Sequence, residues 1–176
     1  MLQTSRDFLT AAFETQKAAF SRDPFPDLRA RRASLKQLLA LTENHEAEFC
    51  AAIDADFGGR SAHETRLAEI VVVRAGIRHA LSHLSSWMAE KRMPTAMPFW
   101  PAKNRLLPQP LGVVGIVSPW NYPFQLALAP ATAALAAGNR VLIKPSELTP
   151  RFSELLASLT AKHFAADQLN IVLGDA

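Results

Sequence analysis

The stretch LGVVGIVSPWNYPF, residues 111–124, decides the fold. Its first half is a continuous apolar and β-branched run, which predicts a strand buried on both faces of a parallel sheet. The run leads into SPWNYP, where Asn121 stands among aromatic residues and prolines. An asparagine cannot act as acid, base or nucleophile, and can only donate and accept hydrogen bonds. Any chemical role of this loop must therefore depend on the position in which it holds the side-chain amide of Asn121.

The chain after this stretch alternates between helix and strand. The order strand–helix–strand–helix–strand predicts a parallel sheet with right-handed crossovers. We therefore expect residues 111–176 to form the first half of a doubly wound, Rossmann-like α/β fold. The predicted elements are a helix at PFQLALAPATAALAA (123–137) stopped by Gly138, a strand at RVLIK (140–144), a helix at RFSELLASLTAKHF (151–164) capped by Thr149, and a strand at NIVLG (170–174).

Residues 1–93 have a helical pattern and are expected to form the N-terminal helical part of the same domain. Gly58 and Gly59 should stop one helix, and Ser61 and Glu64 stand in capping-box register for the next. That second helix carries an apolar stripe that we expect to face the core. Its members are Leu67, Ile70, Ile77, Leu81, Leu84 and Met88.

Residues 94–110 differ from both neighbours because they contain five prolines. Proline lacks a backbone donor, so the segment is predicted to be extended or edge-strand material and not helix. Segments of this kind often arch away from a core and pair with a neighbouring chain. We expect 94–110 to be an extended bridging and oligomerisation segment.

Composition excludes several classes of function. The 176 residues are 49% hydrophobic and 20% charged, with a net charge of +3. The densest basic cluster, at Arg29, Arg31 and Arg32, has no interleaved aromatics, so no nucleic-acid partner is expected. No uncharged apolar stretch reaches the roughly 18 residues that a membrane span needs, and the N-terminus does not resemble a signal peptide. A single cysteine, Cys50, fits a reducing cytoplasm.

Two further features contain residue types that can be reactive or bind metals. Cys50 lies in the acidic stretch EAEFCAAID, which would raise the pKa of its thiol, so a core role is favoured over a nucleophile. His79 and His83 are spaced i, i+4 on a helix but lack a third ligand nearby in the sequence. No metal site is predicted.

Two loops follow predicted strands, where ligands bind in open α/β sheets. Lys144 and Glu147 follow the second strand, and such a pair suits a ribose, although a rim ion pair of little energetic value has the same spacing. Asn121 is open to two interpretations as well, since asparagine is common in turns. Pro119 and Pro123 already fix its loop, however, and a rigidly held amide is what an oxyanion hole needs. The usual G-x-G-x-x-G phosphate turn is absent.

Taken together, PLGVVGIVSPWNYPF and LAAGNRVLIKPSELTP resemble the aldehyde dehydrogenase superfamily. The motifs P-W-N-[YF]-P and K-P-S-E-x-T-P lie at the spacing of that family and are highly specific in combination. ADFGGRSAHETRLAEI and GIRHALSHLSSWM resemble its class-3-like branch, and AKNRLLPQPLGVVGI is most similar to bacterial coniferyl aldehyde dehydrogenases. The resemblance covers nearly the whole chain.

The resemblance implies oxidation of an aromatic, coniferyl-type aldehyde to the carboxylic acid with NAD or NADP, in a homodimer when the enzyme is complete. It implies that Asn121 stabilises the oxyanion and that Lys144 and Glu147 hold the adenosine ribose. Glu147 favours NAD, because a carboxylate repels a 2′-phosphate. The resemblance further assigns Val117, Ser118, Pro119 and Trp120 to the cofactor-lining strand end, and Tyr122, Gln125 and Leu126 to the neighbourhood of the aldehyde tunnel.

The catalytic cysteine, the general-base glutamate and the pyrophosphate segment of the family have no match here. We therefore expect an N-terminal portion of such an enzyme, without its catalytic domain and inactive alone. One alternative is a non-catalytic nucleotide-binding or assembly module that pairs with another subunit through residues 94–110. Another is a chain that barely folds, because half a sheet leaves an open strand edge.

Overall fold

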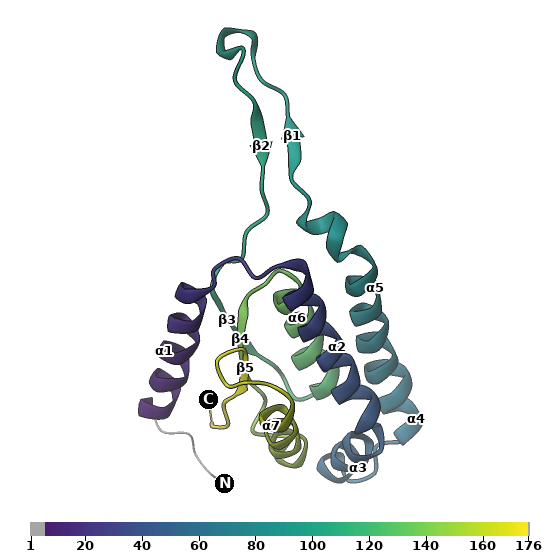
Figure 1. Ribbon diagram of the computed structural model, residues 1–176. Helices are drawn as coiled ribbons and strands as arrows, with labels where there is room; N and C mark the ends of the chain where they lie inside the picture. The colour runs from purple at the N-terminus through teal and green to yellow at the C-terminus, as the bar shows by residue number, and fades with distance from the viewer. Residues whose placement is uncertain (1–5, 176) are drawn as a thin grey trace.

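A short parallel sheet lies at the centre of the computed structural model, which describes residues 6–175 (Figure 1). Within these residues the sheet has three strands in the order β3 (Val113–Val117), β4 (Arg140–Lys144) and β5 (Leu169–Ile171), all parallel. A helix connects each strand to the next, so the predicted half of a doubly wound, Rossmann-like sheet is confirmed.

Most of the chain outside this sheet is helical. Within residues 6–175, no helix is both long and apolar enough to cross a membrane. The remaining elements are α1 (Arg6–Arg22), α2 (Leu28–Asn44), α3 (Glu46–Phe57), α4 (Ala62–Thr65), the π-helical turn η1 (Arg66–Ile70), α5 (Val71–Met88), β1 (Lys91–Met93), the 3-10 turn η2 (Met97–Phe99), β2 (Asn104–Leu106), α6 (Pro123–Ala136) and α7 (Pro150–His163).

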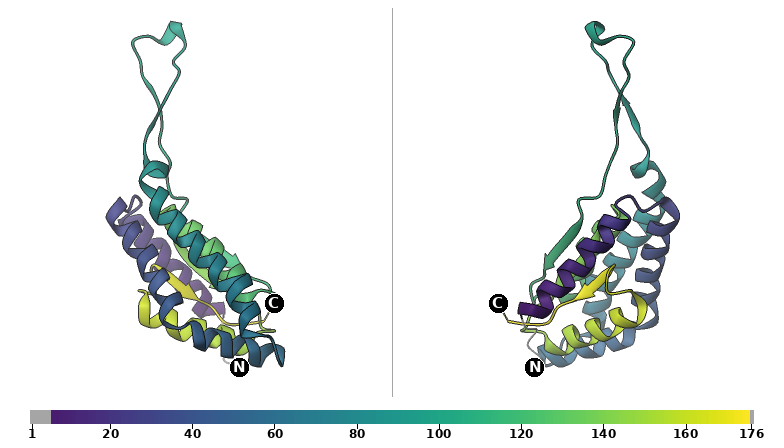
Figure 2. Two further views of the ribbon diagram at one scale, coloured as in Figure 1. Left: turned by 90° about the vertical axis from the view of Figure 1, so that its right-hand side faces the viewer. Right: turned by 60° about the vertical axis from the view of Figure 1, so that its left-hand side comes forward.

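Helices cover the two faces of the sheet unequally (Figures 1 and 2). Alternate residues of a strand point to opposite faces. Leu142 of β4 packs with Ala12 of α1, whereas Val141 and Ile143 belong to the larger core beneath α6 and α7. Buried Gln16 of α1 donates a 2.8 Å hydrogen bond to the carbonyl of Val141, which ties α1 to the sheet.

Helices α2, α3 and α5 form an outer layer over α6 and α7. Three fully buried phenylalanines join the two layers: Phe49 of α3, Phe124 of α6 and Phe152 of α7. The rings of Phe49 and Phe124 meet edge to face with centroids 4.9 Å apart, and those of Phe124 and Phe152 with centroids 6.4 Å apart. Such pairs contribute about 0.5–1.5 kcal/mol each beyond the area that they bury.

The helix predicted after Ser61 is interrupted by the π-helical turn Arg66–Ile70. Ile70, Ile77 and Leu84 are buried as expected, but Leu67 is 62% exposed. The extra residue in a π turn rotates the helix before it relative to the helix after it. The expectation that Leu67 continues the apolar stripe is therefore wrong.

The first strand of the sheet also departs from prediction. A strand buried on both faces was expected, yet Val117 is 80% exposed and Gly115 is exposed as well. Within the described residues, β3 pairs with β4 alone. Exposed Gly115 and Val117 lie on the face opposite to that of buried Ile116, so only one face of this strand is covered. The β-branched run correctly predicted a strand but overestimated its burial.

A hairpin projects from the body between α5 and β3 (Figure 1). Its strands β1 and β2 are antiparallel, with Lys91 opposite Leu106. The segment expected to be extended, 94–110, forms most of this hairpin and includes β2, but the 3-10 turn Met97–Phe99 interrupts it, so the expectation that it contains no helix is wrong at this turn. Its apolar side chains reach no core, since Met97 is 81% exposed and Trp100 is 72% exposed.

Candidate functional site

The carboxyl ends of β3 and β4 bring the two predicted loops together. Val117 pairs with Lys144 in the parallel register, and the N–H of Ser118 donates to the carbonyl of Lys144 at 3.0 Å. SPWNYP and KPSELTP therefore lie at the same edge of the sheet, as expected from the strand order. This edge is the ordinary ligand-binding edge of an open parallel sheet.

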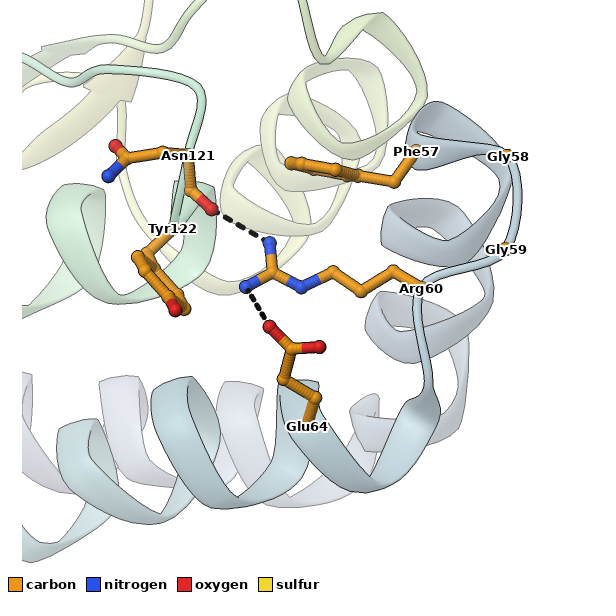
Figure 3. A pocket seen from close by; sticks show the side chains of 7 residues that line it. All are labelled: Phe57, Gly58, Gly59, Arg60, Glu64, Asn121 and Tyr122. Carbon is orange, nitrogen blue, oxygen red and sulfur yellow. Dashed lines mark hydrogen bonds and ion pairs between the residues drawn. The ribbon is translucent and has the colours of Figure 1, made fainter.

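The Asn121 loop lies between the end of β3 and the start of α6. Asn121 and Trp120 are exposed, and Tyr122 is half-buried against the body. Figure 3 shows the side-chain amide of Asn121 directed away from Arg60, while its backbone carbonyl is directed toward that residue. The amide is thus free to reach a ligand while the backbone is held from behind.

Arg60 holds this loop and was not singled out from the sequence. Its guanidinium lies between the rings of Phe57 and Tyr122, at 4.7 Å and 4.6 Å from their centroids, and donates to the Asn121 carbonyl at 2.8 Å (Figure 3). The Arg60 side chain is only 6% exposed. These groups line an open pocket of about 400 Å³ formed by Phe57, Gly58, Gly59, Arg60, Glu64, Asn121 and Tyr122.

Glu64 belongs to the same group but does not complete the predicted capping box. Ser61 is the N-cap of α4, because its hydroxyl accepts a hydrogen bond from the N–H of His63 at 3.2 Å. The Glu64 carboxylate instead accepts from Nη2 of Arg60 at 3.2 Å. Ser61 is confirmed as the N-cap, but its hydroxyl accepts from His63 and not from Glu64 as a capping box requires, and Glu64 forms an ion pair instead.

Glu69 caps the helix that follows the Asn121 loop. Its carboxylate accepts hydrogen bonds from the N–H of Phe124 at 2.8 Å and of Gln125 at 3.1 Å, in the first turn of α6. Glu69 is fully buried, and this burial raises the pKa of its carboxyl group. Its second oxygen lies 3.7 Å from Nη1 of Arg60, which supplies the opposing charge.

The second loop contains the predicted ion pair. Nζ of Lys144 lies 2.7 Å from a carboxylate oxygen of Glu147, and the two side chains are 23% and 32% exposed. The hydrogen bond from Lys144 lowers the pKa of Glu147, so this carboxylate stays ionised. The pair remains accessible to a ligand at the sheet edge.

The helix after this loop is capped in a way that the sequence did not predict. Thr149 was expected to be the N-cap of α7, but its side chain makes no capping hydrogen bond in the described structure. The carboxylate of Asp56, at the end of α3, accepts from the N–H of Arg151 at 3.1 Å and of Phe152 at 2.9 Å. The capping oxygens therefore come from a distant helix.

The other predicted cofactor and substrate residues lie around these two loops. Ser118 is 4% exposed, and among the described residues its hydroxyl has no hydrogen-bond partner. Val117, Pro119 and Trp120 are exposed at the end of β3, and Gln125 and Leu126 are half-buried on the first turn of α6.

The cysteine and histidine residues lie apart from this arrangement. Cys50 is 4% exposed, and its burial raises the pKa of its thiol. The rings of His79 and His83 pack at 4.1 Å on α5. Across residues 6–175, no group of three or more His, Cys, Asp or Glu side chains could hold a metal ion.

The sequence carries little signal for Arg60 and Glu69. Arg60 and Glu64 carry opposite charges four residues apart, although Arg60 precedes the N-cap Ser61 and is not itself helical. Glu69 immediately precedes Ile70 of the apolar stripe, but neighbouring helical residues point in different directions, so this position alone does not predict burial. Neither pattern identifies the partner that lies across the fold.

Comparison with known proteins gives consistent matches over almost the whole chain. Residues 3–176 match the aldehyde dehydrogenase family. A probable coniferyl aldehyde dehydrogenase of Pseudomonas aeruginosa is 46% identical over 167 residues, which are 95% of this chain and 35% of that protein. A coniferyl aldehyde dehydrogenase of a Pseudomonas species is 42% identical over 169 residues, 96% of this chain and 34% of that protein.

The fold is shared with a solved structure as well. The substrate-bound state of Staphylococcus aureus AldH superposes with a TM-score of 0.90 at 31% identity, over 94% of this chain and 36% of that one. The chain thus spans about a third of the length of the proteins that it matches.

Proposed function

The chain belongs to the aldehyde dehydrogenase family, and from this premise we propose that it forms the cofactor-side part of an NAD(P)-dependent enzyme that oxidises an aromatic, coniferyl-type aldehyde to the acid. The observation that carries the proposal is the meeting of the Asn121 loop and the Lys144–Glu147 pair at one edge of the sheet. The aldehyde class follows the names of the two Pseudomonas relatives.

The groups at this edge fit the ribose of a nicotinamide dinucleotide. The ammonium of Lys144 can donate to a ribose hydroxyl, and the carboxylate of Glu147 can accept from one. The unpartnered hydroxyl of Ser118 adds a further polar group at the same strand end. Because Glu147 stays ionised, it repels a 2′-phosphate, so NAD is favoured over NADP. Bound there, the dinucleotide would accept the hydride that the aldehyde loses.

The remaining residues around the Asn121 loop would contact either the aldehyde or the cofactor. The Asn121 amide donates a hydrogen bond to the oxygen that becomes negative when a nucleophile attacks the carbonyl. Exposed Val117, Pro119 and Trp120 would line the cofactor. Tyr122, Gln125 and Leu126 surround the start of α6 and would line the approach of the aldehyde.

The nucleophile is not expected to come from these 176 residues. Cys50 is buried, and its raised pKa keeps the thiol protonated and unreactive. Purified chain mixed with NAD and coniferyl aldehyde should therefore produce no NADH absorbance. Steady NADH formation by protein of verified mass would overturn this part of the proposal.

A chimera provides the test of the residues' roles. The 169 residues of this chain that align with the coniferyl aldehyde dehydrogenase of the Pseudomonas species would replace their counterparts in that enzyme, and aldehyde oxidation should be retained. Asn121→Ala should then lower kcat by about 10²–10³-fold, the usual effect of losing one oxyanion donor. Asn44→Ala, at an exposed position at the end of α2, serves as the control and should leave kcat unchanged. An Asn121→Ala chimera with unaltered kcat would reject the oxyanion role.

A second candidate function is assembly, which the hairpin favours. Met97, Phe99 and Trp100 are all more than two-thirds exposed, and exposed apolar groups of this size mark interaction surfaces. We propose that the hairpin joins two subunits as a homodimer in the complete enzyme. Analytical ultracentrifugation of the chimera should give a dimer that Trp100→Asp dissociates. If the chain binds NAD by calorimetry while the chimera is inactive, the non-catalytic module is the better description.

A further inference from the structure

The two prolines of the Asn121 loop leave part of its backbone unrestrained. A proline fixes its own φ and restricts the residue before it. Pro119 and Pro123 therefore restrain residues 118, 119, 122 and 123, but not Trp120 or Asn121. The expectation that the two prolines alone fix the loop is thus too strong, and a further restraint is needed on the peptide that carries the amide.

Arg60 is placed to supply that restraint. Its guanidinium is held on two faces by Phe57 and Tyr122, and its Nη1 donates to the Asn121 carbonyl at 2.8 Å. An N–H of a charged group makes a stronger hydrogen bond to a carbonyl than a neutral donor does. The orientation of the Asn121 peptide is therefore coupled to a side chain that itself has little freedom.

The same arginine is linked to the far end of the loop. Glu69 lies 3.7 Å from Nη1 of Arg60 and binds the N–H groups of Phe124 and Gln125. Arg60 and Glu69 thus form hydrogen bonds with the backbone on both sides of Tyr122. Since the Asn121 amide points away from Arg60, the arginine does not reach the reacting atoms (Figure 3).

We propose that Arg60 is a positioning residue, which directs the Asn121 amide toward the oxyanion by holding the Asn121 carbonyl. This inference rests on the proposed oxyanion role of Asn121. It predicts that Arg60 contributes to turnover only through Asn121, and that it contributes little to binding of the aldehyde.

A double-mutant cycle in the chimera tests this coupling. Arg60→Ala should lower kcat by about tenfold to 10²-fold with little change in KM, as expected for a misplaced catalytic group. In the Asn121→Ala background, the same substitution should leave kcat nearly unchanged. Arg29→Ala, on the exposed face of α2, is the matched control and should leave kcat unchanged in both backgrounds.

Arg60→Lys guards against a result caused by misfolding. Lysine keeps a positive charge opposite Glu69 but has no planar guanidinium that can stack between the two rings while donating to the Asn121 carbonyl. It should melt close to the parent temperature yet show the reduced kcat. Equal kcat losses in both Asn121 backgrounds, or a parental kcat in well-folded Arg60→Lys, would overturn the positioning role. If Asn121→Ala itself left kcat intact, the proposed function would fail first, and this inference with it.

Discussion

Helices α6 and α7 both follow a functional loop, and they begin alike but are held differently. Each has proline at its first position, and neither is capped by the residue just before it in the described structure. Each takes its capping carboxylate from the N-terminal helices, Glu69 for α6 and Asp56 for α7. The N-terminal helices therefore hold both loops in place, besides packing on the sheet helices.

The difference between the two caps is burial. Glu69 is fully buried, and Arg60 provides its opposing charge, whereas Asp56 is only half-buried. A carboxylate removed from water is costly unless it is paired and hydrogen-bonded. The loop bearing Asn121 therefore depends on a buried charge network, while the loop bearing Lys144 depends on a partly solvated cap.

Removing the buried cap should have the largest effect. Glu69→Ala leaves two N–H groups of α6 uncapped and the Arg60 charge buried without its acid, so we expect a loss of about 3–5 kcal/mol in unfolding free energy. Urea denaturation followed by circular dichroism measures it. Glu69→Gln keeps one acceptor and should lose less. Equal stability of Glu69→Ala and the parent would remove the distinction between the two caps.

Removing the solvated cap should have a smaller effect. Asp56→Ala leaves the first turn of α7 uncapped but exposes no unpaired charge, so the expected loss is about 1 kcal/mol. The same denaturation experiment applies. Asp54→Ala, at an exposed position on the same helix, is the matched control and should change stability by much less. A loss as large as that of Glu69→Ala would contradict the comparison.

The buried cap should also respond to pH. Burial raises the folded-state pKa of Glu69 above its ordinary value of 4.5, so the fold takes up a proton as pH falls between the raised and the ordinary value. The parent should therefore gain stability relative to Glu69→Gln as pH falls from neutral through this window, and the gain should level off below it. If the parent instead loses unfolding free energy relative to Glu69→Gln on acidification, the pKa of Glu69 is not raised in the folded state.

The smallest effect on unfolding free energy is expected at the Lys144–Glu147 ion pair. Glu147 and Lys144 are accessible, and exposed ion pairs contribute little to stability. Glu147→Gln should unfold at the same urea concentration as the parent. In the chimera, however, it should raise the KM for NAD, because an acceptor for ribose is weakened. Unchanged KM together with lost stability would indicate a structural ion pair, the alternative that spacing alone left open.

Much of this arrangement could be read from the sequence, because its signals are local. The β-branched run before SPWNYP and the strand before KPSELTP predicted parallel neighbours, and the strand order then placed Asn121 and Lys144 at one edge. The extended character of 94–110 followed from its prolines. Each of these inferences depends on residues within a few positions of one another.

The features that the sequence does not predict depend on contacts between residues far apart in the chain, or on the exact phase of a helix. Glu69 binds Phe124 across 55 positions, and Asp56 binds Phe152 across 96, so no local pattern connects them. The prediction that Leu67 faces the core is wrong because the π turn shifts the helical phase by one residue. Val117 is exposed because burial of a strand end depends on what surrounds it, which apolar composition does not specify.

The distant caps set an order of events during synthesis. Asp56 leaves the ribosome 96 residues before Phe152, the residue that it caps. At roughly 5–20 residues per second, this interval lasts on the order of 5–20 s. The interval between synthesis of Glu69 and synthesis of α6 is shorter. Until α6 has been synthesised, the charges of Glu69 and Arg60 must remain hydrated. The nascent N-terminal helices are therefore expected to lack stable tertiary packing until the sheet and its helices have been synthesised. Their folding should then be limited by the translation of residues far downstream.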